Sequence, residues 1–430
     1  MPEATPEELT RAVIAACADC DVCRYLMAET SCQFFPELYR LYDRETAGQG
    51  AITALELRQL IELCNFCALC PCANIRTEIM QAKRAFIARD GLPWGLKLLV
   101  DVGRLGRWGC RWPRFSNLWG QWPPTAALVK RGLGMHPDRR LPRFPAASFD
   151  EWAAAAGLLT PPTGSGRKVA FFVGCTGRYL FPEVPRAAVT VLRRLGVEVL
   201  VPEQQCCGLP SLLEGERELT LRLAAFNLPR LAALAEAGYD LVCSCPSCGY
   251  VLKRVWREGA DYAREIGGGP AVLARLLQDE GYFAPLSPRE RLLVARKTYD
   301  LGEYLRALHQ EGAFNLEFQP QPGRVVYFPP CHLREQGIGE PYAALVPLIP
   351  ELTWTQIRGA FYCCGMAGIM GFKREFHPVG VAIATNLVER ITALAPDRLL
   401  CDCLSCRLQF QQLLPCPVQH PIETLAAALA

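Results

Sequence analysis

Short apolar runs alternate with longer amphipathic stretches over the C-terminal two thirds of the chain. The runs at 167–175 and 324–331 are rich in β-forming residues, and each ends at a cysteine. The stretches at 184–195, 215–236 and 377–394 have apolar residues at helical spacing. Strands that alternate with helices predict parallel sheets with helices on their faces. We therefore predict an α/β fold for this part of the chain.

The α/β part contains one cysteine pattern twice. A single cysteine, an adjacent pair followed by glycine, and a CxxC pair occur in the same order in each copy. The first set is Cys175, Cys206, Cys207, Cys245 and Cys248, and the second is Cys331, Cys363, Cys364, Cys403 and Cys406. Such a repeat predicts a duplicated domain. Where a cysteine follows a predicted strand, it stands at the edge where parallel sheets place their sites.

The rest of the chain differs from this repeat. Residues 123–166 are rich in proline and show no period, which predicts an irregular linker. We predict five parts: an α-helical domain at 1–90, an amphipathic segment with a proline-rich linker at 91–166, a first α/β domain at 167–267, a helical connector at 268–322 and a second α/β domain at 323–430.

The stretch at 91–122 combines tryptophans with basic residues. It holds five of the eight tryptophans. Lys97, Arg104 and Arg107 fall near one face of a helical projection, and the glycines at 103, 106 and 109 weaken the predicted helix. A basic amphipathic helix with interfacial tryptophans suits a membrane surface. The alternative is a helix packed over the metal sites or against a partner protein.

Composition argues against a nucleic-acid-binding or membrane-spanning protein and favours a metal-binding one. The chain has 430 residues, 22 cysteines and a net charge of only +3. The small charge argues against nucleic acid as a main partner. No export signal is evident, and no apolar run is long enough to span a membrane. Cysteines grouped at CxxC spacing in such a chain indicate metal binding in a reducing compartment.

Two further motifs lie in the N-terminal domain, each of the form C-x2-C-x2-C. Three thiolates at this spacing can hold three corners of a cubane [4Fe–4S] cluster, with the fourth supplied from elsewhere. We expect crossed ligation, in which each motif borrows a distant cysteine. The expected sets are Cys17, Cys20 and Cys23 with Cys72, and Cys64, Cys67 and Cys70 with Cys32. A zinc ribbon is the alternative, but it would leave cysteines unused.

Each set in the α/β repeat offers five thiolates, one more than a cubane takes. An adjacent pair can ligate neighbouring irons, and the glycine that follows, Gly208 or Gly365, lets the backbone turn tightly. A zinc site takes four ligands, and disulfides use an even number. Both alternatives therefore explain five cysteines poorly.

Three polar residues near the second set have two possible roles. A histidine beside a cluster, such as His332 or His420, tunes its potential by hydrogen bonding to sulfur or carries protons. The alternative is a capping or solvent-facing histidine. Lys373, after the second CCG motif, either offsets the negative charge of a cluster or lies at a solvated helix start.

The tandem C…CCG…CxxC modules resemble the CCG (cysteine-rich) domains of heterodisulfide reductase and its relatives. The resemblance implies a noncubane [4Fe–4S] cluster held by five cysteines in each module. Paired ferredoxin motifs before two such modules are similar to the iron–sulfur subunits of anaerobic glycerol-3-phosphate, glycolate and lactate-oxidising complexes. The expected fold class is multidomain: an N-terminal α-helical, two-cluster ferredoxin-like domain, then two duplicated α/β CCG domains with parallel sheets.

This resemblance implies an iron–sulfur electron-transfer subunit of an anaerobic respiratory oxidoreductase. Such a protein passes single electrons between a flavoprotein dehydrogenase partner and the membrane quinone pool. It would be cytoplasmic and peripheral at the inner face of the cytoplasmic membrane. No flavin or nicotinamide motif is present, so chemistry on the organic substrate is expected in the partner. The alternative is a heterodisulfide-reductase-like catalytic subunit that reduces a disulfide at a noncubane cluster.

Overall fold

The computed structural model describes residues 4–28, 30–64, 66–67, 70, 72–260, 281–359 and 362–430. The end of the predicted first α/β domain, 261–267, and the start of the predicted connector, 268–280, lie outside the described residues.

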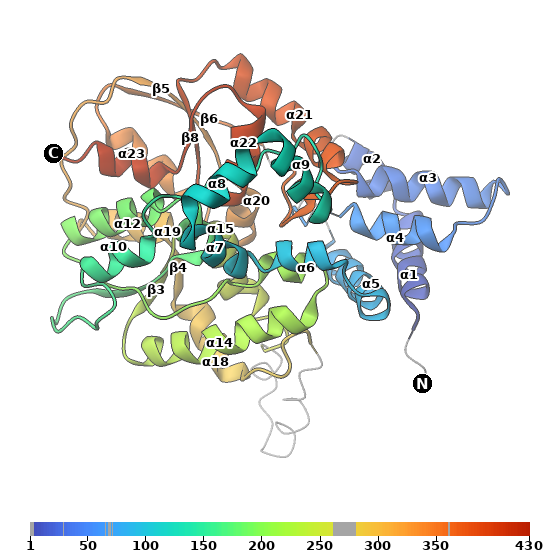
Figure 1. Cartoon of the computed structure of the whole chain (residues 1–430), viewed down its shortest axis with the longest axis horizontal. Helices are drawn as coiled ribbons and strands as arrows, with labels where there is room; N and C mark the ends of the chain where they lie inside the picture. The colour runs from blue at the N-terminus through green and yellow to red at the C-terminus, as the bar shows by residue number, and fades with distance from the viewer. Residues whose placement is uncertain are drawn as a thin grey trace.

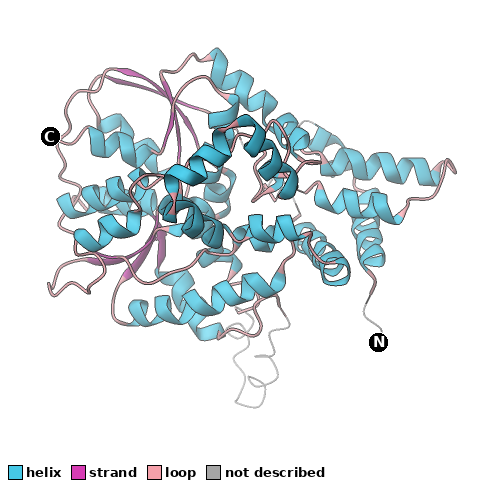
Figure 2. Ribbon diagram, in the orientation of Figure 1, coloured by secondary structure: helices cyan, strands magenta, loops and turns pink. Residues whose placement is uncertain are grey.

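Two four-stranded parallel sheets lie one above the other at the left of the view (Figure 2). The strand orders are β2-β1-β3-β4 and β6-β5-β7-β8, so the two sheets share one topology. Every neighbouring pair is parallel. The strands are β1 Lys168–Phe172, β2 Glu198–Leu200, β3 Asp240–Cys243, β4 Thr298–Asp300, β5 Gly323–Phe328, β6 Leu352–Gln356, β7 Arg398–Cys401 and β8 Val418–Gln419. The predicted pair of parallel α/β units is confirmed.

Helices cover both sheets, and the three predicted from periodicity are present as α12, α14 and α21. Those around the first sheet are α11 Gly174–Tyr179, α12 Glu183–Arg194, α13 Leu209–Leu213, α14 Arg217–Glu236, α15 Pro246–Tyr250, the π-helix η1 Val251–Val255, α18 Pro288–Lys297 and α19 Leu301–Gln310. Those around the second are α20 Cys331–Glu335, η2 Pro341–Ala344, η3 Val346–Leu348, η4 Met370–Phe372, α21 His377–Ala393, α22 Leu404–Leu413 and α23 Pro421–Ala427.

The predicted connector contributes to the first sheet. Between its two helices, α18 and α19, lies β4, which pairs with β3. The sequence analysis did not predict this strand, because three residues are too few to show a period. The first α/β unit therefore extends at least to α19.

Five helices form the N-terminal region, drawn in blue at the right of Figure 1. They are α1 Pro6–Ala18, α2 Asp21–Ala28, α3 Phe34–Thr46, α4 Ala54–Glu62 and α5 Ala73–Asp90. Thr5 and Thr53 begin α1 and α4 with reciprocal capping boxes, which satisfy otherwise unpaired backbone N–H groups. The helices have their own core, which includes Phe34, Leu38 and Leu60. The prediction of helices for this region is confirmed.

The segment at 91–166 runs across the front of both units as short helices (Figure 1). They are α6 Trp94–Val100, α7 Val102–Arg111, α8 Pro113–Gln121, α9 Pro123–Gly132 and α10 Phe149–Ala155. The predicted single amphipathic helix is broken at Asp101, which caps α7, and at Pro113, which begins α8. The prediction of an irregular linker was wrong at α9 and α10. Pro123 and Pro124 are the first two residues of α9, and a proline in the first turn of a helix does not break it.

Two glycines of α7 are close contact points, one with the first α/β unit and one with a later part of the same segment. A Cβ atom at Gly106 would lie 2.3 Å from the ring of Tyr179, and one at Gly109 would lie 2.2 Å from Phe144. The glycines expected to weaken this helix instead let it pack closely against its neighbours.

Candidate iron–sulfur sites

In each α/β unit, the five predicted ligand cysteines follow three of the four strands. In the first unit, Cys175 follows β1, the pair Cys206-Cys207 follows β2, and the CxxC motif follows β3. The second unit repeats this arrangement after β5, β6 and β7. The carboxyl ends of parallel strands form a common edge, so residues distant in sequence meet there. All ten side chains are near the junction of the two units.

The five thiols of the first unit form one contiguous group. The Sγ atoms of Cys175 and Cys206 are 3.3 Å apart. Cys207 interacts with Cys206 and with Cys248, and these neighbours lower the pKa of the Cys207 thiol to about 6. Cys245 lies beside Cys248. The same burial and contacts raise the pKa values of Cys175, Cys206 and Cys248, so the group favours the thiolate form at Cys207. Closely packed thiols of this kind are suited to binding iron, which displaces their protons.

The second unit has the same grouping. Cys364 interacts with Cys363 and Cys406, which lower its pKa to about 7. Cys331 lies beside Cys363, and Cys403 lies beside Cys406. The equivalence of the two groups extends the duplication from the fold to the arrangement of the sulfur atoms.

The two groups meet each other, which the sequence did not indicate. Cys245 of the first unit interacts with Cys403 of the second, and this contact is the main reason that the pKa of Cys403 is lowered. Nine of the ten thiols line a single cavity of about 50 Å³. Ser247 Oγ lies 3.4 Å from Cys403 Sγ, so a polar group also crosses the junction.

The N-terminal cysteines are arranged as crossed ligation requires. Each of the two distant cysteines lies near the motif to which the crossed arrangement assigns it. Cys72 is near Cys17 and Cys23, and Cys32 is near Cys64 and Cys70. The ligation itself stays a prediction.

A further contact links the N-terminal domain with the second α/β unit. Cys67 interacts with Cys363 and lies near Cys331, and the contact with Cys363 is the main cause of its raised pKa. The thiols therefore form a row from the N-terminal helices, through the second unit, to the first. Neighbouring redox centres at such contacts would be close enough for electrons to pass between them.

The donor set of the two α/β units fits iron–sulfur clusters. Nine of the ten thiols lie around a shared space. An iron–sulfur cluster binds separate thiolates at separate irons, whereas zinc takes four ligands around one point.

Lys373 is not at a solvated helix start, and its offset of cluster charge stays a prediction. Its side chain is buried and contacts Glu62 of α4 and Glu214 of the first unit, the latter at 3.0 Å. Lys83 of α5 lies 3.9 Å from the same Glu214. This buried charge cluster joins the N-terminal domain to both α/β units, so Lys373 is a structural cation at their junction.

The two histidines hold the units together. His332 is buried, its ring stacks on Tyr250 at 5.0 Å between centroids, and its Nδ1 lies 2.9 Å from Ser247 Oγ. Burial lowers the pKa of His332 to about 4, so the ring is neutral near pH 7. His420 caps α23, as its capping alternative predicted, and its Nε2 lies 2.9 Å from the carbonyl oxygen of Ser244.

Sequence reasoning missed a buried cation near the second cysteine group. Arg139 is 1% exposed, donates to Gln409 Oε1 and lies over the ring of Phe372 at 4.3 Å. Burial lowers its pKa to about 10, and the charge of Cys364 opposes that shift. Arg139 is thus a positive charge within electrostatic range of the second cysteine group. Its neighbour Arg140 is exposed, and no sequence pattern distinguishes the two.

In the part of the chain that the structure describes, no helix has the length and apolar character needed to cross a bilayer.

Comparison with known proteins agrees with this geometry. Residues 169–253 and 325–411 each match the family described as "Cysteine-rich domain" (CCG). The chain is 27% identical to a subunit of anaerobic glycerol-3-phosphate dehydrogenase from Escherichia coli (strain K12), over 71% of this chain and 70% of that protein. It is 28% identical to a subunit of fumarate reductase (CoM/CoB) from Methanothermobacter marburgensis, over 57% of this chain and 42% of that protein. Lactate utilization protein A of an Exiguobacterium species is 27% identical, over 60% of this chain and 96% of that protein.

Proposed function

We propose that the chain, whose two CCG domains resemble those of heterodisulfide-reductase-like proteins, carries electrons within a dehydrogenase complex. It passes electrons one at a time between a flavoprotein dehydrogenase partner of glycerol-3-phosphate, glycolate or lactate type and the membrane quinone pool. The observation that carries this proposal is the row of neighbouring thiols through all three domains.

We assign four clusters to this row. Two cubane [4Fe–4S] clusters are held by the crossed N-terminal sets, and two noncubane [4Fe–4S] clusters by the five-cysteine sets of the α/β units. Clusters of this type supply reversible one-electron chemistry when bound. The ligands of the four clusters are Cys17, Cys20, Cys23 and Cys72; Cys64, Cys67, Cys70 and Cys32; Cys175, Cys206, Cys207, Cys245 and Cys248; and Cys331, Cys363, Cys364, Cys403 and Cys406.

The protein's own groups keep these sites dry and tune them. Nearly all thiols of the two CCG sets are buried, which excludes water from the metal. Ser247 lies within hydrogen-bonding distance of Cys403 Sγ, and Arg139 places a positive charge near Cys364. Hydrogen bonds to sulfur and nearby positive charge both favour the reduced state of a cluster.

Iron analysis tests the cluster count. The anaerobically purified chain should hold about sixteen irons, with matching sulfide, because eighteen cysteines are arranged as four sites. A value near eight together with zinc would contradict the filling of both CCG sites. Reduction of a disulfide to two thiols by the chain, with a chemical electron donor in place of any flavoprotein, would support the alternative, disulfide reduction.

A substitution at Cys72 serves as the internal check on ligand assignment. Cys72→Ser should remove the EPR signal of the cluster held by Cys17, Cys20 and Cys23, although Cys72 follows the other motif in sequence. Cys416→Ser is the control, because Cys416 lies outside all four sets, and it should keep every signal. Loss of only the Cys64-motif cluster in Cys72→Ser would reverse the assignment.

We also propose that α6–α9 dock the chain on the inner face of the cytoplasmic membrane. Trp108 and Trp112 are 75% and 67% exposed, beside Arg104 and Arg107. Exposed aromatic rings with basic neighbours bind anionic lipid surfaces.

Trp108→Ser with Trp112→Ser should abolish co-flotation with anionic liposomes at unchanged iron content. Leu159→Ser, at an exposed apolar residue elsewhere, should have no effect, and equal binding by both variants would refute docking through α7.

A further inference from the structure

Three neighbouring cavities lie between the surface at α8–α9 and the cysteine groups. The outer one has a volume of about 1060 Å³, the middle one about 330 Å³, and the inner one is the 50 Å³ cavity lined by the thiols. The outer and middle cavities share walls at Met135, Leu141 and Leu408. The middle and inner cavities share Thr176 and Ser405. The middle cavity therefore separates solvent from the cysteine-lined space.

The middle cavity is apolar. Among the described residues that line it none is charged, and most are aliphatic or aromatic, such as Leu99, Leu105 and Phe144. Its volume is that of a small-molecule site. Hydroxyl-bearing residues stand at its inner end, where Thr176 follows Cys175 and Ser405 precedes Cys406 in the chain. Their hydroxyl groups can donate to a carbonyl oxygen of a ligand.

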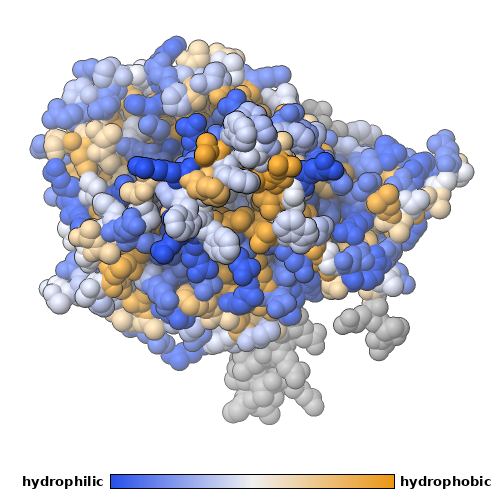
Figure 3. All heavy atoms as spheres, viewed as in Figure 1, coloured by the Kyte–Doolittle hydropathy of each residue, from blue (hydrophilic) through white to orange (hydrophobic). Residues whose placement is uncertain are grey.

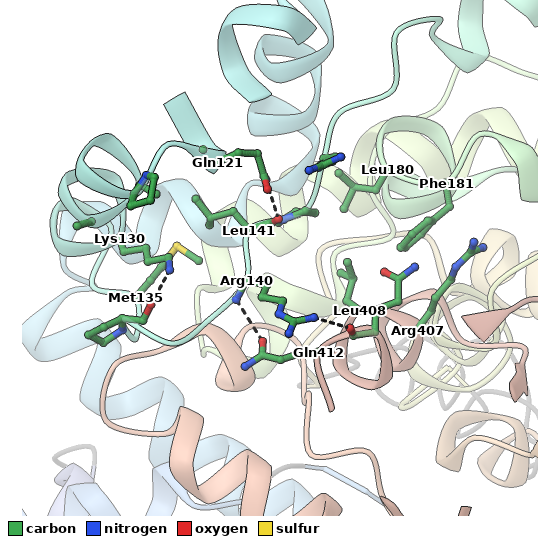
Figure 4. A pocket seen from close by; sticks show the side chains of 18 of the residues that line it. Gln121, Lys130, Met135, Arg140, Leu141, Leu180, Phe181, Arg407, Leu408 and Gln412 are labelled. Carbon is green, nitrogen blue, oxygen red and sulfur yellow. Dashed lines mark hydrogen bonds between the residues drawn. The ribbon is translucent and has the colours of Figure 1, made fainter. Parts of the chain in front are cut away.

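The outer cavity is cationic. Figure 4 shows Lys130, Arg140 and Arg407 around it, and Arg131, Arg143 and Arg374 also line it. Glu183 is the one acidic residue among its described lining residues, and it is paired with Arg407. A positive rim of this kind attracts anionic lipid head groups.

The helices that cover the middle cavity also carry the exposed aromatic surface. Trp119 of α8 lines the cavity and is still 44% exposed. Pale and orange spheres cover the face in Figure 3 where Figure 1 places α6–α9. One group of helices thus presents apolar rings outward and encloses an apolar cavity beneath.

We propose that the middle cavity binds the ring of a lipid-soluble quinone, with its tail directed toward the outer cavity. This inference rests on the proposed function and names the place where its quinone binds. An anionic disulfide would lose its hydration in this cavity without gaining a charged partner, which is costly. A neutral ring with two carbonyl oxygens matches the apolar walls and the hydroxyl groups beside Cys175 and Cys406.

Adjacent residues of α9 supply a matched test. Val129 lines the middle cavity, whereas Leu128 is 66% exposed and lines none of the three. Equilibrium dialysis of the iron-loaded chain with a short-tailed 1,4-naphthoquinone should give an affinity at least about tenfold weaker for Val129→Trp. Leu128→Trp should bind within about twofold of wild type, because its ring extends into solvent.

Leu105→Trp is a second variant that fills the same cavity, from α7, and it should weaken quinone binding in the same way. Full iron content shows that each variant is folded. No quinone binding by the wild-type chain, or undiminished binding by both cavity variants, would overturn the inference. So would stronger binding of oxidised glutathione than of the quinone.

If the complex with its flavoprotein reduces quinone equally well with Val129→Trp, the site is wrong and the function stands. If quinone binds as described but the reduced complex never transfers electrons to it, the function is wrong and the site stands.

Discussion

Replacing Lys373 by methionine is expected to lower the free energy of unfolding by about 3–5 kcal/mol. The lysine is buried against Glu62 and Glu214, and its removal would leave two carboxylates near each other without their main cation. Lys83 is the other cation of the cluster, but it lies farther from Glu214, at 3.9 Å, so it compensates only in part. Denaturant unfolding of the iron-loaded chain measures the change.

Arg374→Met is the control for Lys373→Met. Arg374 is adjacent in sequence but exposed, so its replacement should change stability by no more than about 0.5 kcal/mol. Adding Glu62→Gln to Lys373→Met should recover part of the loss, because the remaining carboxylate, Glu214, is still paired with Lys83. Equal destabilisation by Arg374→Met and Lys373→Met would show that the buried cluster has no special role.

Gly365→Ala is expected to destroy the second CCG site, with a loss of about four irons per chain. Gly365 has φ +74°, and a Cβ there would lie 1.9 Å from the carbonyl oxygen of Gly380 in α21. Backbone atoms cannot move aside as a side chain can, so α21 would have to separate from the cysteine turn. We expect destabilisation above about 4 kcal/mol, in the range of severe core defects.

The equivalent glycine of the first unit offers the comparison. Gly208 has φ +91°, but the nearest atom to an added Cβ is Thr220 Cγ2 at 3.5 Å, an ordinary contact. Gly208→Ala therefore meets only the backbone strain of about 1–3 kcal/mol and should keep its iron. Equal iron loss in both variants would mean that positive φ, not the contact with α21, decides the outcome.

The elements that could be predicted from sequence are those with a local period. The duplication, the strands that end at cysteines and the helices α12, α14 and α21 all leave such patterns. Cys243 and Cys401, which lie outside the ligand sets, are the last residues of the central strands β3 and β7 and have no exposed surface. The short strand β4 leaves no period and was missed.

The contacts between the domains could not be predicted, because they depend on how separately folded units pack. Nothing in the motif of Cys245 indicates that it meets Cys403, and nothing beside Cys67 indicates Cys363. Lys373 was misjudged for the same reason, since Glu62 and Glu214 are far from it in the chain. Arg139 and Arg140 look alike in sequence, and only their packing makes one of them a buried charge.

The position of the thiols also bears on the order of assembly. The cysteine groups lie between the units, and nine of the ten thiols line one small cavity there. If these groups hold the proposed clusters, iron and sulfide would reach them most readily while the units are still apart, because closed domains leave little room for a cluster to enter. The ion pairs of Lys373, which join the three domains, would then form after the metal is in place.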